Sequence, residues 1–178
     1  MVKSMKLKMD LNSKKILCIG AGGSATAITY EALRDGLGED GELVILNRSP
    51  ERAYKLGDKW NLLFKKRGIK RKEVITGGLD KIERYALESN IILSTITSGY
   101  PISEELASRI PATTTFIDIR YGPKAEFAKL GRDTGHSVVD GWGMVVFGVE
   151  QAARLAFRRN LGIDFDPKLS DMLLKKVI

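Results

Sequence analysis

Short apolar runs and helical stretches alternate along most of the chain, and this alternation constrains the fold more than any other feature. The first run, KILCIG at 15–20, ends in glycine and precedes an Ala- and Leu-rich stretch that stops at Gly36. The second run, 42–47, precedes a helix start with Ser49 as N-cap and Pro50 at the first helical position. We expect further strands at 73–76, 90–95, 115–119 and 136–139, and helices at 24–35, 49–66, 81–88, 103–109, 124–134 and 144–160.

Continuous apolar strands separated by helices predict an α/β fold with a parallel sheet covered on both faces. We therefore expect one doubly wound domain with a mostly parallel sheet, formed by residues 14–165, with a lead-in over 1–13 and a C-terminal helix over 166–178. Such sheets bind ligands at the carboxyl ends of their strands. The glycine-rich and polar clusters of this chain follow predicted strands, so we expect a binding site there.

Length and composition exclude several classes of protein. The 178 residues are too few for a (β/α)8 barrel, which takes about 250, and are short for a dehydrogenase that holds both cofactor and substrate. A single cysteine, Cys18, excludes an internal disulfide framework, and a single histidine, His136, argues against a metal site. No apolar run approaches the roughly 18 residues of a membrane span, and residues 1–10 lack the apolar core of a signal peptide. We expect a cytoplasmic protein without a metal or a membrane partner.

The net charge of +7 raises the question of nucleic-acid binding. Basic residues cluster at 65–67 and 70–72, but no aromatic residues for base stacking are interleaved with them. A solvated basic face is the better interpretation, and we expect no nucleic-acid partner, although nucleic-acid association stays open as a weaker alternative. The charge is compatible with anionic ligands such as phosphorylated cofactors.

The glycine loop between the first strand and the first helix predicts dinucleotide binding in a Rossmann-like fold. Gly20 permits a tight turn, Gly22 lets a pyrophosphate approach the backbone, and residues 23–27 offer a helix N-terminus, which attracts anions. The cofactor-binding set expected in this loop is Gly20, Ala21, Gly22, Gly23, Ser24 and Ala25. A glycine loop alone is weak evidence for dinucleotide binding, but here a predicted strand precedes it and a predicted helix follows it.

The end of the second strand predicts that the cofactor is NADP(H). Folds specific for NAD place an acidic residue here to hold the ribose 2′-hydroxyl. This chain has Asn47, Arg48 and Ser49, with Arg52 one helical turn further on. Two arginines and a hydroxyl suit a 2′-phosphate, which a carboxylate would repel.

Four motifs together resemble the NADP-binding domain of the shikimate dehydrogenase family. They are GAGGSATA at 20–27, NRSPERA at 47–53, DIRYGP at 118–123, and GWGM at 141–144 with Gln151 beyond. Their order and approximate spacing match over about residues 13–165. The resemblance implies hydride transfer between NADPH and 3-dehydroshikimate. It also implies that Thr95, Ile96 and Thr97 lie beside the nicotinamide ribose, that Gly141 and Met144 pack near the nicotinamide, and that Tyr121 and Gln151 contact substrate.

The departures from the family bear on activity. Its N-terminal substrate-binding domain, with the catalytic lysine and aspartate, has no counterpart here, so we assign no catalytic residue. The family's glutamine follows the methionine by four residues, whereas Gln151 follows Met144 by seven and Gly148 takes the expected place. Ser94 stands where the family has asparagine, and Tyr100 where it has methionine.

These observations leave two main hypotheses. The first is an NADP(H)-binding oxidoreductase unit that completes its site with a separate substrate-domain chain or within a homo-oligomer. The second is a non-catalytic NADP(H) sensor or regulatory module, favoured by the lack of an evident proton donor. An NADP dehydrogenase of a different family, acting on another carbonyl or a folate-like substrate, is a further alternative. We further expect a buried Cys18, a hydrogen-bond-accepting Asp118, a surface His136, and oligomerisation through apolar positions near the C-terminus, such as Ala152, Leu155 and Met172.

Overall fold

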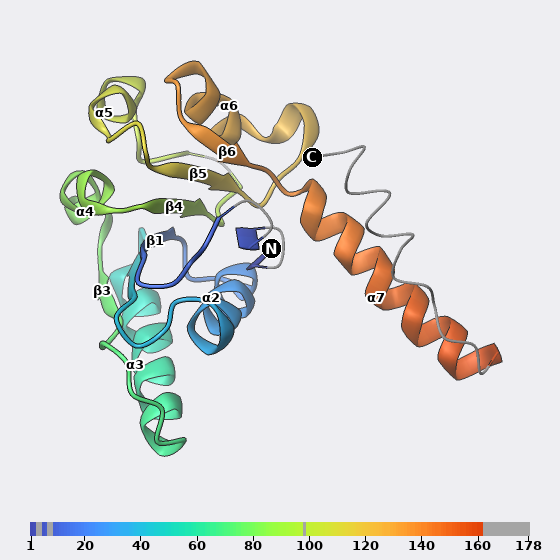
Figure 1. Ribbon diagram of the computed structural model, residues 1–178. Helices are drawn as coiled ribbons and strands as arrows, with labels where there is room; N and C mark the ends of the chain where they lie inside the picture. The colour runs from blue at the N-terminus through green and yellow to red at the C-terminus, as the bar shows by residue number, and fades with distance from the viewer. Residues whose placement is uncertain (3–4, 7–8, 98, 162–178) are drawn as a thin grey trace.

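The computed structural model describes residues 1–2, 5–6, 9–97 and 99–161, and within 151–161 it describes the side chains of Ala152 and Arg158. Its strands are all parallel and form a six-stranded sheet in the order β3-β2-β1-β4-β5-β6 (Figure 1). The strands are β1 (Lys15–Ile19), β2 (Glu42–Leu46), β3 (Ile75–Gly77), β4 (Ile91–Ser94), β5 (Thr115–Asp118) and β6 (Ser137–Val139). The expected doubly wound parallel sheet is confirmed.

The helices begin and end close to the predicted residues. They are α2 (Gly23–Asp35), α3 (Pro50–Lys66), α4 (Ile82–Glu88), α5 (Glu104–Arg109), α6 (Glu126–Asp133) and α7 (Trp142–Leu161), with short 3-10 turns η1 (Leu79–Lys81) and η2 (Gly122–Lys124). Ser49 is the N-cap of α3 and Pro50 is its first residue, as predicted. Gly36 follows α2, where a Cβ would press on the Ala32 carbonyl and on Leu11.

Order reversal between β1 and β4 creates the switch point of the sheet. From β1 the chain adds β2 and β3 on one side and then β4, β5 and β6 on the other. Crossovers between parallel strands are right-handed as a rule, so reversing the direction places the two sets of helices on opposite faces. On the first face α2 and α3 pack against Cys18, Ile45 and Ile91. Met1, Val2, Met5 and Leu11 of the lead-in are buried in the same cluster.

The second face of the sheet is covered by α4, α5 and α6. Phe116 of β5 stacks on Phe127 of α6 with ring centroids 5.0 Å apart. His136 belongs to this layer: its ring lies 4.6 Å from that of Phe116, and the residue is only 7% exposed. The surface position expected for His136 is therefore wrong, because Nδ1 lies 3.0 Å from Thr134 Oγ1 and Nε2 lies 3.3 Å from the Ile110 carbonyl, so both ring nitrogens have partners inside the fold.

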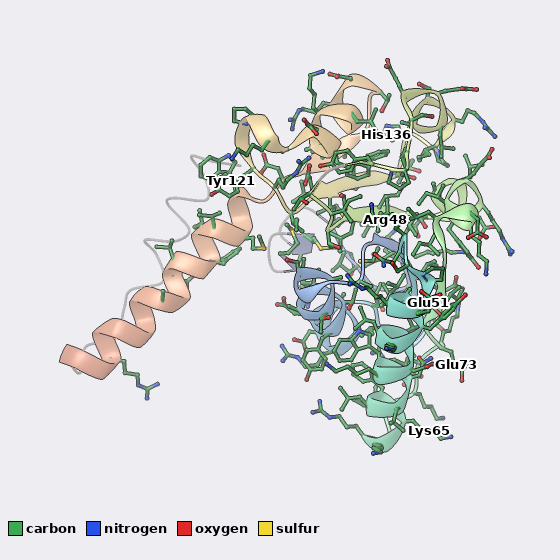
Figure 2. All side chains as sticks on the ribbon, turned by 180° about the vertical axis from the view of Figure 1, so that it is seen from behind. Arg48, Glu51, Lys65, Glu73, Tyr121 and His136 are labelled. Atoms are coloured by element: carbon green, nitrogen blue, oxygen red, sulfur yellow. The ribbon has the colours of Figure 1, made fainter. Side chains whose placement is uncertain are left out.

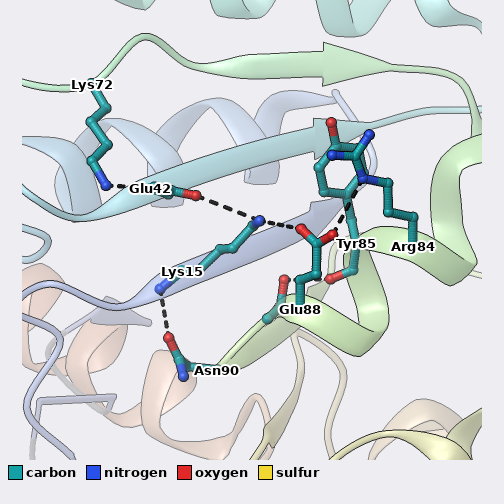
Figure 3. A network of polar contacts seen from close by, with 8 residues as sticks. Lys15, Glu42, Lys72, Arg84, Tyr85, Glu88 and Asn90 are labelled. Atoms are coloured by element: carbon teal, nitrogen blue, oxygen red, sulfur yellow. Dashed lines mark hydrogen bonds and ion pairs between the residues drawn. The ribbon is translucent and has the colours of Figure 1, made fainter.

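An ion-pair network crosses the amino edge of the sheet (Figure 3). Lys15 at the start of β1 contacts Glu88 at 2.6 Å and Glu42 at 3.5 Å, and Lys72 contacts Glu42 at 2.8 Å. The backbone N–H of Lys15 also donates to Asn90 Oδ1 at 2.9 Å. The network thus ties the starts of β1, β2 and β4 together at the edge opposite the expected site.

Helix α7 leaves the sheet after β6 and extends away from the domain (Figure 1). Of its described side chains, Val149 is 61% exposed and Ala152 is exposed. The expected C-terminal helix at 166–178, and the side chains of Leu155 and Met172, lie outside the described residues. In the described part of the chain no helix is both long and apolar enough to cross a membrane.

Candidate functional site

A cleft of about 330 Å³ opens at the carboxyl edge of the sheet, where β1, β2 and β4 end. Its walls bring together ten of the residues predicted from sequence to bind a cofactor: Gly20, Ala21, Gly22, Asn47, Arg48, Ser49, Arg52, Thr95, Ile96 and Thr97. Backbone hydrogen bonds hold the three loops in line, from Gly20 N–H to the Leu46 carbonyl at 2.8 Å and from Thr95 N–H to the Ile19 carbonyl at 2.9 Å.

Gly20 lines the cleft and has a φ of +112°, a backbone conformation that residues with a side chain rarely adopt. A Cβ at Gly20 would overlap Thr95 Oγ1 and lie 3.1 Å from Ile96 Cγ2. Thr95 Oγ1 is held in this position because it donates to the Ile19 carbonyl at 2.9 Å. The tight turn expected at this glycine is therefore present, and its physical reason is close approach to the loop after β4.

The N-terminus of α2 faces the cleft with a glycine as its N-cap. Gly22 has an extended backbone and no side chain to bond the helix, and a Cβ there would meet nothing within 4 Å. The first N–H groups of a helix lack partners inside the helix. Gly23, Ser24 and Ala25 form this first turn, with Ser24 exposed and Ala25 buried. Open space, free donors and the positive end of the helix dipole suit an anion at this point.

The turn after β2 carries the positive charge of the cleft. The Asn47 side chain donates to the Ser49 carbonyl at 3.0 Å, and the Asn47 N–H bonds the Gly77 carbonyl at 3.1 Å, so the turn is fixed on both sides. Arg48, Ser49 and Arg52 are exposed around the start of α3, and Figure 2 labels Arg48 there. Because no carboxylate lines the described cleft, a phosphate near this turn would meet two cations and a hydroxyl.

Other residues that the resemblance singled out lie outside this cleft. Tyr121 lies beside the start of α7 (Figure 2), 45% exposed, with its ring 4.6 Å from that of Trp142. Gly141 is buried, with its N–H bonded to the Arg120 carbonyl at 2.8 Å. Met144 packs against the core on the face of the sheet that α2 and α3 cover. The side chain of Gln151 lies outside the described residues.

Asp118 organises the neighbouring turn from a fully buried position. Its Oδ1 accepts the Arg120 N–H at 2.9 Å, and its Oδ2 accepts the N–H groups of Phe127 at 3.1 Å and Ala128 at 3.4 Å. Burial raises the pKa of Asp118, while these backbone donors act in the opposite direction. Its expected role as a hydrogen-bond acceptor is confirmed. Cys18, also as expected, is buried, and burial raises the pKa of its thiol to about 12.

The sequence prediction missed three residues of the cleft wall: Ile19, Leu79 and Gly99. Leu79 reaches the cleft because β3 pairs with β2 and ends beside Asn47. A signal was present, since the glycine pair Gly77 and Gly78 marks the end of the short third strand. Apolar wall residues of this kind suit the faces of a nucleoside.

A larger hollow, of about 1080 Å³, lies at the opposite edge of the sheet. Charges of both signs line it, and several of them are engaged in structural contacts. Arg71 donates to the Leu33 carbonyl and Lys6 to the Asp35 carbonyl, so both bind the carbonyl end of α2. Arg34 pairs with the Asp35 side chain. These cations stabilise the C-terminus of α2. The cleft at the carboxyl edge, although smaller, is therefore the better candidate for a ligand site.

Comparison with known proteins identifies relatives of the chain. The family model described as Shikimate / quinate 5-dehydrogenase matches residues 2–123. Among curated proteins, shikimate dehydrogenase (NADP(+)) of Pyrococcus abyssi is 26% identical over 148 residues, covering 82% of this chain and 49% of that protein. The protein of the same name from Ruthia magnifica is 31% identical over 149 residues, covering 83% and 50%. The chain thus spans about half the length of the curated relatives it matches.

Solved structures show the same fold. Shikimate 5-dehydrogenase from Listeria monocytogenes, crystallised with shikimate and NAD, superposes with a TM-score of 0.72 at 20% identity, covering 97% of this chain and 60% of that one. The Ael1 enzyme from Pseudomonas putida gives 0.67 at 19% identity, covering 98% and 58%. Both likenesses establish the architecture of the sheet and its helices.

Proposed function

The chain belongs to the shikimate/quinate 5-dehydrogenase family, and from this premise we propose that it binds NADP(H) as the cofactor-binding part of an oxidoreductase. One observation carries the proposal. The described cleft gathers the glycine turn, the Arg48 turn and the loop after β4 on one edge of a doubly wound sheet, at its switch point. Dinucleotides bind at this position in such sheets.

The residues present fit the parts of the cofactor in order. The pyrophosphate would lie on Gly20–Gly22 and the first turn of α2, since space and free N–H groups meet there. The adenosine would lie toward Leu79, with its 2′-phosphate between Arg48 and Arg52. The nicotinamide ribose would lie along Thr95–Thr97, on the other side of Gly20. When bound, the nicotinamide supplies the hydride, and the chain's own part is to hold and orient it.

We propose NADP(H) over NAD because of the turn after β2. The related proteins carry both cofactors in their descriptions, NADP(+) for the curated relatives and NAD for the Listeria crystal structure. Here Asn47 replaces the acidic residue that holds a free ribose 2′-hydroxyl, and two exposed arginines flank the same position. Charge-assisted hydrogen bonds to a phosphate are about twice as strong as neutral ones.

Catalysis on a substrate would need groups from a second polypeptide chain. Reduction of a ketone needs a proton donor beside the hydride donor. In the described cleft the titratable side chains are Arg48 and Arg52, and arginine keeps its proton in proteins. We propose that a separate substrate-domain chain or a second copy supplies the donor and holds shikimate, 3-dehydroshikimate or a related carbonyl compound. Tyr121 would lie at the junction, with Gln151 on α7 as a further substrate contact.

A second function is favoured by the same cleft chemistry: an NADP(H) sensor or regulatory module without catalysis. Both functions require cofactor binding, and they differ in turnover. The sensor hypothesis predicts tight NADP(H) binding with no hydride transfer in any assembly.

Two measurements test these proposals in sequence. Isothermal titration of the full chain should give a lower Kd for NADP(+) than for NAD(+), and equal affinities would overturn the NADP assignment. Absorbance of NADPH at about 340 nm, followed with shikimate and NADP(+), then reports turnover. The oxidoreductase proposal predicts a rate that rises when the substrate-domain chain is added, whereas a flat baseline in both mixtures supports the sensor.

A further inference from the structure

Arg120 joins the segment after β5 to the loop after β4. Its Nη1 donates to the Thr97 carbonyl at 2.8 Å, and its guanidinium lies 4.9 Å from the centre of the Tyr100 ring. The side chain is only 17% exposed. Thr97 lines the cleft, whereas Arg120 does not. A cation outside the cleft therefore holds part of its wall.

Arg120 is itself fixed from several sides. Its N–H donates to Asp118 Oδ1 at 2.9 Å, and Nε lies 3.5 Å from the same oxygen. Nη2 lies 3.7 Å from Glu126 Oε2, and the Arg120 carbonyl accepts the Gly141 N–H at 2.8 Å. The guanidinium therefore connects the end of β5 and the start of α6 to the loop after β4, and the Arg120 backbone reaches the turn after β6.

The loop after β4 is held at two points, by β1 at its first residue and by Arg120 further along. Thr95 is tied to β1 through its N–H and Oγ1, which both bond the Ile19 carbonyl at 2.9 Å. Two residues later, the Thr97 carbonyl accepts a hydrogen bond from Arg120 Nη1 at 2.8 Å. Gly99 follows with φ of +68°, a conformation that permits the chain to turn away. Arg120 thus sets the path of the stretch that would face the nicotinamide ribose.

We propose that Arg120 is a positioning residue for the nicotinamide half of NADP(H), acting through Thr97. The inference rests on the proposed function. A planar guanidinium can stack on Tyr100 while it donates to Thr97 in a fixed direction, which the point charge of lysine cannot do. The adenosine half, held at Arg48 and Arg52 on the other side of Gly20, is independent of Arg120.

Cofactor fragments separate the two halves of the site. Calorimetric titrations would use NADPH and 2′,5′-ADP, which carries the adenosine and 2′-phosphate but no nicotinamide. Arg120→Met keeps the apolar stem over Tyr100 and should raise the Kd of NADPH about tenfold. It should leave the Kd of 2′,5′-ADP within about twofold. Arg120→Lys should fall between wild type and Arg120→Met for NADPH.

Arg71→Met is a matched control. Arg71 also stacks on an aromatic ring, 4.4 Å from the centre of Phe64, and donates to a backbone carbonyl, that of Leu33, but at the opposite edge of the sheet. Its loss should leave both affinities unchanged. Hydrogen exchange gives a readout in the absence of ligand: the amides of Ile96, Thr97 and Gly99 should exchange faster in Arg120→Met, with those of Gly23–Ala25 unchanged.

The outcomes are distinguishable. Equal weakening of NADPH and 2′,5′-ADP in Arg120→Met, or no weakening of NADPH, would overturn the positioning role. Failure of the wild-type chain to bind either ligand would instead reject the proposed function. If Arg120→Met does not fold, Arg120→Lys decides, and unchanged NADPH affinity together with unchanged exchange at Thr97 would contradict the inference.

Discussion

Gly20 packs so closely against Thr95 that a Cβ on the glycine would overlap the threonine hydroxyl. The contact joins the turn after β1 to the loop after β4, and both turns form walls of the candidate cofactor cleft. Gly20 is therefore needed for the fold of the cleft as well as for access to it. Gly22, two residues on, has open space where its Cβ would be. The two glycines should respond differently to the same substitution.

Gly20→Ala should destabilise the protein by about 2 kcal/mol or more, because it adds backbone strain and a steric clash. Gly22→Ala should cost less than about 1 kcal/mol, the range of a changed N-cap, yet weaken NADPH binding about tenfold by filling the space that the pyrophosphate needs. Urea denaturation and calorimetric titration measure the two effects. A stable Gly20→Ala, or a Gly22→Ala with native NADPH affinity, would contradict this account of the turn.

Arg48→Ala and Arg52→Ala should discriminate between cofactors. Each would remove a proposed charge-assisted contact to the 2′-phosphate and should raise the Kd of NADP(+) about 10- to 100-fold, while the Kd of NAD(+) stays within about twofold. Arg109→Ala, at the end of α5, is the control for loss of one positive charge. Parallel loss of both cofactors in the Arg48 and Arg52 variants would show that the arginines do not hold the phosphate.

Lys15→Met should lower stability in a pH-dependent manner. Lys72 lowers the pKa of Glu42, and Lys15 lowers that of Glu88, from their ordinary value of 4.5. A lowered carboxylate pKa stabilises the fold above about pH 4.5, and the contribution is lost as the pH falls below it. We expect Lys15→Met to cost about 0.5–1 kcal/mol at pH 7 and clearly less at pH 3.

Urea denaturation at both pH values, followed by tryptophan fluorescence, measures this difference. Arg84→Met is the comparison, because Arg84 pairs with Glu88 at 3.3 Å and is far more exposed. It should show a smaller effect at pH 7. A cost of Lys15→Met that does not change with pH would mean that packing against Tyr85, and not the charge of Lys15, is what stabilises the edge.

Two further glycines should respond in opposite directions to alanine. A Cβ at Gly131 of α6 would lie 2.8 Å from Phe116 Cβ and 3.0 Å from Val138 Cγ2. Gly131→Ala should therefore destabilise by about 1–3 kcal/mol. Gly148 is exposed within α7 with nothing near its Cβ position, so Gly148→Ala should stabilise that helix by about 0.5–1 kcal/mol. Thermal unfolding monitored by circular dichroism separates the two results, and a shift of the same sign in both variants would contradict them.

The strands and helices were predictable because their signals are local. An apolar run such as 42–47, followed by Ser49 and Pro50, specifies a strand and a helix start without reference to the rest of the chain. The gathering of Gly20, Arg48 and Thr95 was also predictable, since parallel strands place their carboxyl ends on one edge. The resemblance to a family added expected roles for residues later in the chain, such as Tyr121 and Gln151.

What could not be predicted depends on contacts between distant segments. His136 stands next to Gly135 and Ser137, which favours an exposed turn, but β6 pairs with β5 and brings the ring under the Ile110 carbonyl. Leu79 enters the cleft only because β3 pairs with β2. Arg120 is an ordinary charged residue within DIRYGP until the fold places Tyr100 and Thr97 beside it.

The most direct test of cofactor binding in this cleft is a nuclear magnetic resonance titration of the isotope-labelled chain with NADP(+). Amide shift changes should concentrate in the cleft, at Gly20–Ala25, Asn47–Arg52 and Thr95–Thr97, with little change at the amino-edge hollow around Asn12 and Lys70. Shift changes centred on that hollow, or none at millimolar NADP(+), would contradict the proposed site.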